Sequence, residues 1–119
     1  MTEVGADISV QVCGEAIYAM TRKFRLTRAE ALRRMDAWIE LLSVRGLSAG
    51  GFLSALTLTR DHSFQIFDAM ILATAAEGQC QLLVSEDMQD GFVWRGVTVV
   101  NPFAPKMHNL LKSYLDMKT

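Results

Sequence analysis

Residues 66–76 constrain the fold more than any other stretch, because every position except Asp68 is apolar or small. A helix that is hydrophobic on all sides is normally buried. Ser63 can cap such a helix and Gly78 can end it, so the pattern predicts a buried helix over residues 64–77. A carboxylate within it is costly unless it is paired, hydrogen-bonded, bound to metal, or exposed near the helix start. Asp68 is therefore either part of a site or a helix-start charge.

Segments typical of strands alternate with helical patterns along the 119-residue chain. Strands are expected at residues 8–12, 82–85 and 97–100. Further helices are expected at residues 14–24, 27–43, 52–58 and 106–118. The second of these opens with a capping box from Thr27 to Glu30. Short buried strands separated by helices predict an α/β fold with a largely parallel sheet.

The composition predicts one globular domain over residues 1–119, since half of the residues are hydrophobic and 21% are charged. No apolar run approaches the roughly 18 residues that a membrane span needs, and the amino terminus lacks the pattern of a signal peptide. We therefore expect a cytoplasmic protein with no membrane contact.

Basic residues are unevenly distributed, although the net charge is only −1. Half of the twelve Lys and Arg residues fall in one segment, namely Arg22, Lys23, Arg25, Arg28, Arg33 and Arg34. Such a cluster is suited to RNA phosphates. The alternative is a helix end followed by solvated helix faces, and the sequence leaves both open.

Three acids share one description: each follows a predicted strand or lies in the first turns of a predicted helix. They are Glu15, Asp68 and Asp87. The carboxyl ends of parallel strands gather at one sheet edge, where three carboxylates would repel unless a cation shared them. Mg²⁺ and Mn²⁺ prefer such oxygen ligands. Taken singly, Asp87 also suits a solvated turn and Glu15 a helix N-terminus.

Two segments carry a specific resemblance. Residues 63–91, which contain Phe-Asp-Ala around Asp68 and Ser-Glu-Asp ending at Asp87, resemble the second half of a PIN domain of the VapC type, and so do residues 96–103. Residues 8–15 resemble the second strand of that family and the glutamate after it. The likeness runs from residue 7 to residue 103 and leaves residues 104–119 as a C-terminal helical extension. It implies a three-layer sandwich with a mostly parallel sheet.

The resemblance also implies a site and an activity. Members of the family hold Mg²⁺ or Mn²⁺ with four acids and cleave RNA. Glu15, Asp68 and Asp87 match acids of that set, Ser85 matches a hydroxyl residue that steadies the site, and Asp90 is a candidate outer acid. The implied function is a metal-dependent endoribonuclease of a toxin–antitoxin system, with RNA as substrate and an antitoxin protein as partner.

The sequence departs from the family at its start. The family opens with a strand that ends in an Asp-x-Asn motif, and no such motif precedes the strand expected at residues 8–12. We therefore expect a shortened sheet and impaired activity. The strand is normally central, so its absence exposes edges that favour a strand-swapped homodimer. A start further upstream is another interpretation.

Two other functions remain open. One is a catalytically inactive PIN remnant that acts as a binding or oligomerisation module. The other is an unrelated α/β protein that binds a ligand at its strand ends.

Overall fold

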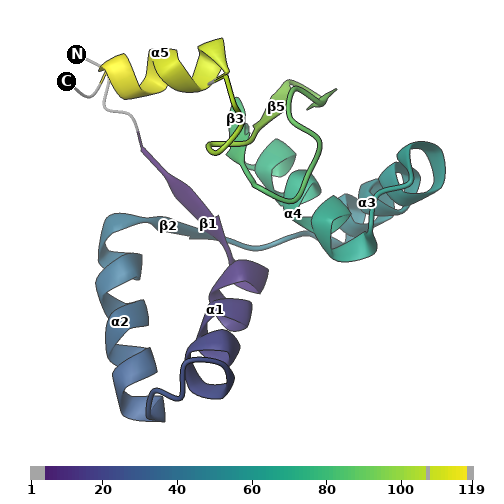
Figure 1. Cartoon of the computed structure of the whole chain (residues 1–119). Coiled ribbons are helices and arrows are strands. Elements are labelled where there is room, and N and C mark those ends of the chain that lie inside the picture. The colour runs from purple at the N-terminus through teal and green to yellow at the C-terminus, as the bar shows by residue number, and fades with distance from the viewer. Residues whose placement is uncertain (1–4, 107, 118–119) are drawn as a thin grey trace. The chain divides into compact units, whose positions relative to one another are not determined.

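The computed structural model describes residues 5–106 and 108–117. They fall into two compact units, which we call the amino-terminal unit (Gly5–Gly46) and the carboxy-terminal unit (from Leu47 onward). Helices and strands alternate in both units, so the predicted α/β class is confirmed. Each unit is described by itself below (Figure 1).

The amino-terminal unit is a pair of helices with a short two-stranded sheet. Its elements are β1 (Asp7–Ser9), α1 (Val10–Arg22), α2 (Arg28–Leu41) and β2 (Ser43–Arg45). The two strands are parallel, with Ile8 opposite Val44. The helices lie side by side (Figure 1) and carry the buried residues Met20, Ala31 and Met35. The small apolar core of this unit therefore lies on α1 and α2.

Two helix N-caps set the boundaries between strand and helix in this unit. Thr27 caps α2 as predicted, since its Oγ1 accepts a hydrogen bond from Glu30 N at 3.2 Å. The strand expected at residues 8–12 is wrong beyond Ser9, because Ser9 Oγ accepts from Val12 N at 3.0 Å and caps α1. Capping satisfies a helix N–H and outweighs the strand preference of the β-branched residues. The helix expected at residues 14–24 thus begins earlier, and β2 was not predicted.

The carboxy-terminal unit packs helices against a three-stranded sheet. Its elements are α3 (Ala49–His62), α4 (Ile66–Glu77), β3 (Leu82–Val84), β4 (Val93–Trp94), β5 (Val97–Val100) and α5 (Asn109–Met117). The strand order is β3-β5-β4, with β3 parallel and β4 antiparallel to β5. The strands at residues 82–85 and 97–100 were predicted, whereas β4 was not. The helix expected at residues 106–118 is shorter, and residues 107, 118 and 119 lie outside the described residues.

The β4–β5 hairpin turns on two residues in the left-handed region. Arg95 has a φ of 48° and Gly96 a φ of 82°. Two successive positive φ values define the tight turn whose twist matches that of an antiparallel pair. Glycine adopts this conformation readily, whereas an arginine does so at a cost. The hairpin is thus set by a turn that the sequence marks with only one glycine.

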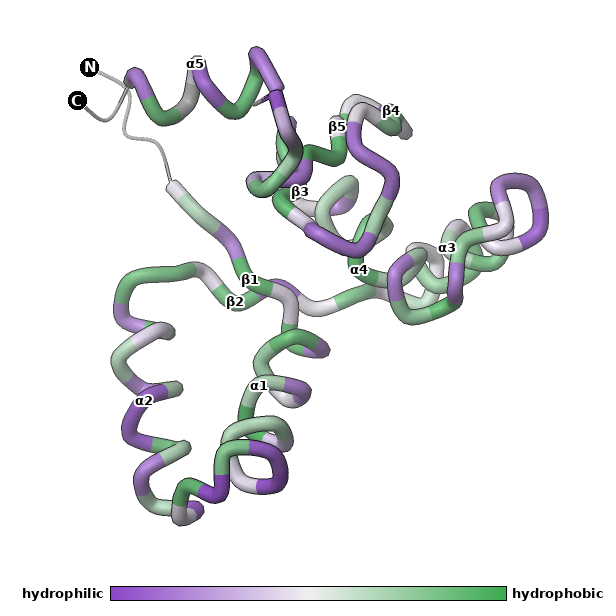
Figure 2. Tube along the Cα trace, viewed as in Figure 1, coloured by the Kyte–Doolittle hydropathy of each residue, from purple (hydrophilic) through white to green (hydrophobic). Residues whose placement is uncertain are grey.

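The core of the carboxy-terminal unit lies between α3, α4 and the sheet. Leu58, Leu72, Val97 and Val99 have no exposed surface. Hydrophobic positions, green in Figure 2, recur along α4, β3 and β5. The burial predicted for α4 is confirmed for one face only, because Phe67 is 52% exposed. This helix therefore packs on one side and leaves its first turn accessible.

The connection between α3 and α4 differs from the expectation for Ser63. Ser63 has a φ of 58° and ends α3, and Gln65 caps α4 instead. The Oε1 atom of Gln65 accepts from Phe67 N at 2.9 Å and from Asp68 N at 3.2 Å. The longer amide side chain reaches the same N–H groups that a serine would. Gly78 ends α4 as predicted.

α3 is also longer than the expected residues 52–58. Ser48 caps it by accepting from Gly51 N at 2.9 Å, so that Gly50 and Gly51 lie inside the first turn. Within the described residues, no helix is long and apolar enough to cross a membrane.

Candidate acidic site

The loop after β3 is anchored at both ends. Ser85 N donates to Val100 O at 2.9 Å, which extends the parallel pairing with β5 by one residue. Ser85 Oγ then accepts from Asp87 N at 3.3 Å and Met88 N at 3.4 Å. Met88 is buried in the core, whereas Asp87 is exposed. Ser85 and Asp87 therefore lie at the carboxyl end of a parallel strand, as the sequence indicates.

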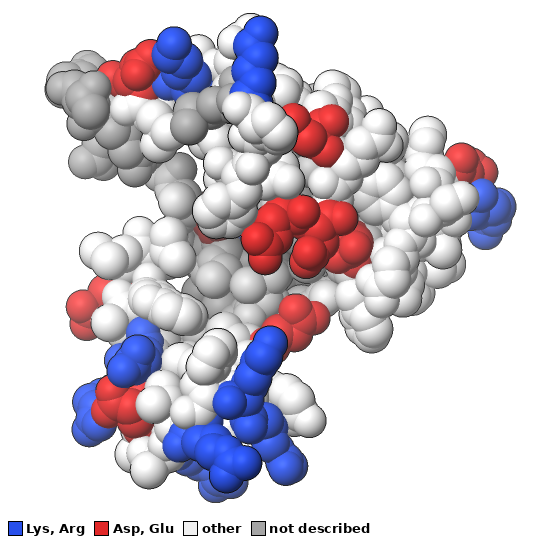
Figure 3. Space-filling model, viewed as in Figure 1, with Lys and Arg blue, Asp and Glu red and all other residues white. Residues whose placement is uncertain are grey.

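Asp90 joins the same loop to the end of β5. Its Oδ1 atom accepts a hydrogen bond from Asn101 N at 2.7 Å. The next residue, Gly91, has a φ of 88° and donates its N–H to Val99 O at 2.7 Å. Asp90 thus has a structural role in closing the loop. Acidic side chains, red in Figure 3, gather on the face of this unit that carries the β3–β4 loop.

Asp68 lies in the first turn of α4 and is half-buried. Its backbone N–H is held by the capping amide of Gln65. A carboxylate in the first turn interacts favourably with the helix dipole. Asp68 therefore has the position of a stabilising helix-start charge. Its side chain is also partly accessible to solvent.

Glu15 belongs to the other unit and does not open its helix as expected. Because α1 begins at Val10, Glu15 is in the second helical turn. Its Oε1 atom accepts from Gln11 Nε2 at 3.0 Å, and the residue is exposed. The helix dipole acts mainly within the first turn, so it offers little explanation for this acid.

The donor chemistry of these acids fits a hard divalent cation, since carboxylate oxygens are the ligands that Mg²⁺ and Mn²⁺ prefer. Among residues 5–106 and 108–117, no three or more His, Cys, Asp or Glu side chains form a group that could hold a metal. The chemistry of the ligands therefore agrees with the prediction, and their assembly around a cation stays a prediction.

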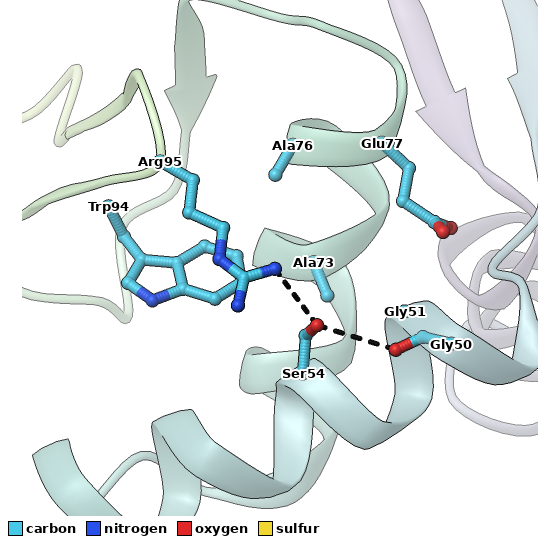
Figure 4. Close-up of a pocket in the computed structure, with 8 residues that line it drawn as sticks. All are labelled: Gly50, Gly51, Ser54, Ala73, Ala76, Glu77, Trp94 and Arg95. Atoms are coloured by element: carbon cyan, nitrogen blue, oxygen red, sulfur yellow. Dashed lines mark hydrogen bonds between the residues drawn. The ribbon is translucent and has the colours of Figure 1, made fainter.

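A small hollow was not predicted from the sequence. It lies near the end of α4 and the start of β5, whereas the acids described above in the carboxy-terminal unit lie near the start of α4 and the end of β5. Its volume is about 220 Å³ (Figure 4). It is lined by Gly50, Gly51, Ser54, Ala73, Ala76, Glu77, Trp94 and Arg95. The adjacent glycines and the Trp-Arg-Gly sequence were the available signals, and neither indicates that the two segments meet.

Polar contacts in this hollow tie its walls together. Glu77 accepts hydrogen bonds from Ser48 Oγ and from Ser48 N, the latter at 2.9 Å. These bonds hold the pKa of Glu77 below its usual value. Arg95 donates from Nη1 to Ser54 Oγ at 2.9 Å, and its guanidinium lies 4.4 Å from the centre of the Trp94 ring. The contacts join α4 and the hairpin to the start of α3.

The basic segment divides into two groups. Arg33 and Arg34 pair with Glu30 on the same face of α2, and their hydrogen bonds lower the pKa of Glu30. The remaining members surround the α1–α2 connection and form no ion pair with any residue that the structure describes; they are Arg22, Lys23, Arg25 and Arg28.

Strand, helix and acidic loop together define an α/β protein with carboxylates at the carboxyl end of a parallel strand. The family model of the PIN domain matches residues 8–89, a segment that includes Glu15, Asp68, Ser85 and Asp87. The chain belongs to the PIN domain family. PIN domains are in general divalent-metal-dependent nucleases, so the chain has a nuclease-type fold. The comparison with curated proteins finds no match.

Proposed function

We propose that this chain is a VapC-type PIN domain that acts as a metal-dependent endoribonuclease of a toxin–antitoxin system in the cytoplasm. The observation that carries the proposal is the Ser85 turn, which presents Asp87 at the carboxyl end of β3. The family match supports it, because it contains this turn together with Asp68 and Glu15. The match also runs through both compact units, which supports a single domain over residues 1–119.

In this proposal Glu15, Asp68 and Asp87 hold Mg²⁺ or Mn²⁺, and Asp90 acts as an outer acid. The bound cation would activate water for attack on a phosphodiester and stabilise the leaving oxygen. Ser85 positions Asp87 by accepting its backbone N–H, and Gln65 positions Asp68 in the same way. Each supporting side chain thus fixes the backbone that carries an acid.

The second candidate is an inactive PIN remnant that serves as a binding or oligomerisation module. Two observations favour it. One oxygen of Asp90 is engaged by Asn101 N. The strand order also leaves β3 at an edge of its sheet among the described strands. An open edge favours pairing with another chain, in a homodimer or with an antitoxin.

Isothermal titration with Mn²⁺, paired with thermal unfolding with and without Mn²⁺, tests the proposal. We expect saturable binding and a raised melting temperature, both abolished by Asp87→Asn. Asp36→Asn is the matched control, since it makes the same change of charge at an exposed acid of α2 outside the proposed set. Cleavage of an RNA substrate that requires Mn²⁺ and stops with EDTA would then establish the activity.

The outcomes separate the two candidates. A chain that binds no Mn²⁺ at millimolar concentration, or binds it equally well after Asp87→Asn, is not the proposed nuclease. A dimer in sedimentation together with absent metal binding would support the oligomerisation module instead.

A further inference from the structure

The connection between α1 and α2 is a short, fixed turn. Leu26 N donates to Met20 O at 2.9 Å, and Phe24 N donates to Ala19 O at 3.1 Å. Arg25 has a φ of 57°, in the left-handed region. The backbone of the turn is therefore tied to the end of α1, which fixes the positions from which its side chains project. We call Tyr18 and residues 22–28 the basic tip.

The basic tip concentrates positive charge. It contains Arg22, Lys23, Arg25 and Arg28, and the sequence has no acid between Glu15 and Glu30. All four basic residues are exposed. Figure 3 shows Lys and Arg side chains, in blue, gathered at the end of the amino-terminal unit where α1 and α2 join. Four cations on one short turn repel one another and favour an anionic partner.

Two aromatic rings accompany these cations. Phe24 is 67% exposed and Tyr18 is 65% exposed. The guanidinium carbon of Arg22 lies 5.7 Å from the centre of the Tyr18 ring. An exposed phenylalanine beside cations is the combination that binds single-stranded nucleic acid, where the backbone meets positive charge and a base stacks on the ring. The sequence indicated the basic cluster, but it did not indicate that these two rings are exposed.

The needs of the fold account for only part of the basic tip. Arg22 and Lys23 have the sign that the carboxyl end of α1 favours. Arg28 is the first residue of α2, where the helix dipole disfavours a cation. The side chain of Phe24 is left largely in water and adds little to the core. The contrast with Arg33 and Arg34, which are paired with Glu30, points to a role for the basic tip outside folding.

We propose that the basic tip binds single-stranded nucleic acid, with phosphates on Arg22, Lys23, Arg25 and Arg28 and a base stacked on Phe24. The inference deepens the proposed function and rests on it for the choice of a nucleic-acid partner. A single strand fits better than a duplex, because only an unpaired base can leave its stack to meet the ring.

Fluorescence anisotropy with a labelled oligouridylate, measured over a range of salt concentrations, tests this binding. All variants carry Asp87→Asn, so that the probe stays intact. Removing two phosphate contacts by Arg25→Gln with Arg28→Gln should weaken binding and reduce the salt slope by about 1.4. Phe24→Ala should weaken binding by about 5- to 150-fold, the range for one stacked base. The matched control is Arg33→Gln with Arg34→Gln, which changes the net charge equally and should leave the slope unchanged.

Several results would overturn the inference. They are no binding of the oligouridylate, equal effects of the two double variants, or a Phe24→Ala variant that binds as tightly as its parent. Displacement by polyglutamate as effective as by unlabelled oligouridylate would indicate a site for an acidic protein. Circular dichroism melting checks that each variant is folded. A chain that binds through the basic tip but cleaves no RNA with Mn²⁺ would refute the proposed function alone, and cleavage without tip binding would refute this inference alone.

Discussion

Two adjacent glycines in the first turn of α3 have opposite surroundings, which makes them a sensitive test of the packing between α3 and α4. A Cβ atom at Gly51 would lie 2.5 Å from Leu47 Cδ1 and 2.7 Å from the Glu77 carboxyl group. A Cβ atom at Gly50 would meet only Ser48 Oγ, at 3.8 Å, which is an ordinary contact. Both glycines are helical, so alanine fits the backbone at each position.

The two substitutions share one effect and differ in another. Replacing a helical glycine by alanine stabilises a protein by about 0.5–1 kcal/mol, because alanine reduces the conformational entropy of the unfolded chain. Gly50→Ala should show this increase alone. Gly51→Ala should add overpacking against Leu47 and Glu77, which costs about 1–3 kcal/mol. The free energy of unfolding should therefore be about 1–3 kcal/mol lower for Gly51→Ala than for Gly50→Ala.

Urea unfolding followed by circular dichroism measures this difference, provided that both variants keep the wild-type m-value. Glu77 is exposed and can swing away, whereas Leu47 is half-buried and has less room. Glu77→Ala alone already loses the Ser48 contact, so it serves as the background for the comparison. In that background Gly51→Ala should cost less than in the wild type, but still more than Gly50→Ala. Two variants of equal stability, or a Gly51→Ala protein more stable than the wild type, would refute the close packing of α3 on α4 at this point.

Three further predictions follow from individual contacts. Thr27→Ala removes the cap of α2 and should lower the free energy of unfolding by about 1 kcal/mol in urea titrations; an unchanged midpoint would contradict the cap. Glu77→Gln should lower stability above pH 4.5, the ordinary pKa of Glu77. Because the folded-state pKa is lowered, the stabilisation is present above that value and disappears as the pH falls through the folded-state pKa. The difference in melting temperature between wild type and Glu77→Gln should therefore shrink as the pH is lowered. A difference that stays constant across this pH range would count against the Ser48 contact. Asp68→Asn should raise the melting temperature of the metal-free protein if Asp68 lies among repelling metal ligands, whereas a helix-start charge alone predicts a loss of a few tenths of a kcal/mol to about 1 kcal/mol.

Local signals predicted the elements that depend on local contacts. The start of α2 follows from Thr27 and Glu30, which are neighbours on one helical turn. The end of α4 follows from Gly78. The β3 and β5 segments are short apolar runs whose pairing needs no unusual backbone. In each case the residues that determine the structure lie within the segment itself.

The predicted element boundaries were wrong where one residue could take two roles, or where two residues could each cap the same helix. Ser9 could extend a strand or cap a helix, and the following residues favour the helix. Ser63 and Gln65 could each cap α4, and Ser63 is instead used in a left-handed conformation to end α3. The displacement of the α1 start also moved Glu15 from the expected first turn to the second. An error of a few residues at a boundary thus changes the chemical surroundings of a candidate ligand.

The acidic site and the hollow differ in the same way: contacts between sequence neighbours could be predicted, and contacts between distant residues could not. The placement of Ser85 and Asp87 after β3 could be predicted, since the strand and the turn are adjacent in the sequence. The contact of Glu77 with Ser48 and that of Arg95 with Ser54 could not, because these partners are far apart in the chain. Such pairs depend on tertiary packing, for which the sequence carries no local pattern.

The sparse core of the amino-terminal unit has a consequence for how the chain opens. Its two strands form only three residue pairs, and a sheet of two strands is at best marginally stable alone. Among the described residues its buried apolar side chains are Met20, Ala31 and Met35, whereas α4 and β5 belong to a larger cluster. Amide protons of α1 and α2 should therefore exchange through partial unfolding, at a lower free energy than those of α4 and β5. A protease that captures transiently open chains would cut first within residues 5–46, so the turnover of the protein would be governed by this unit.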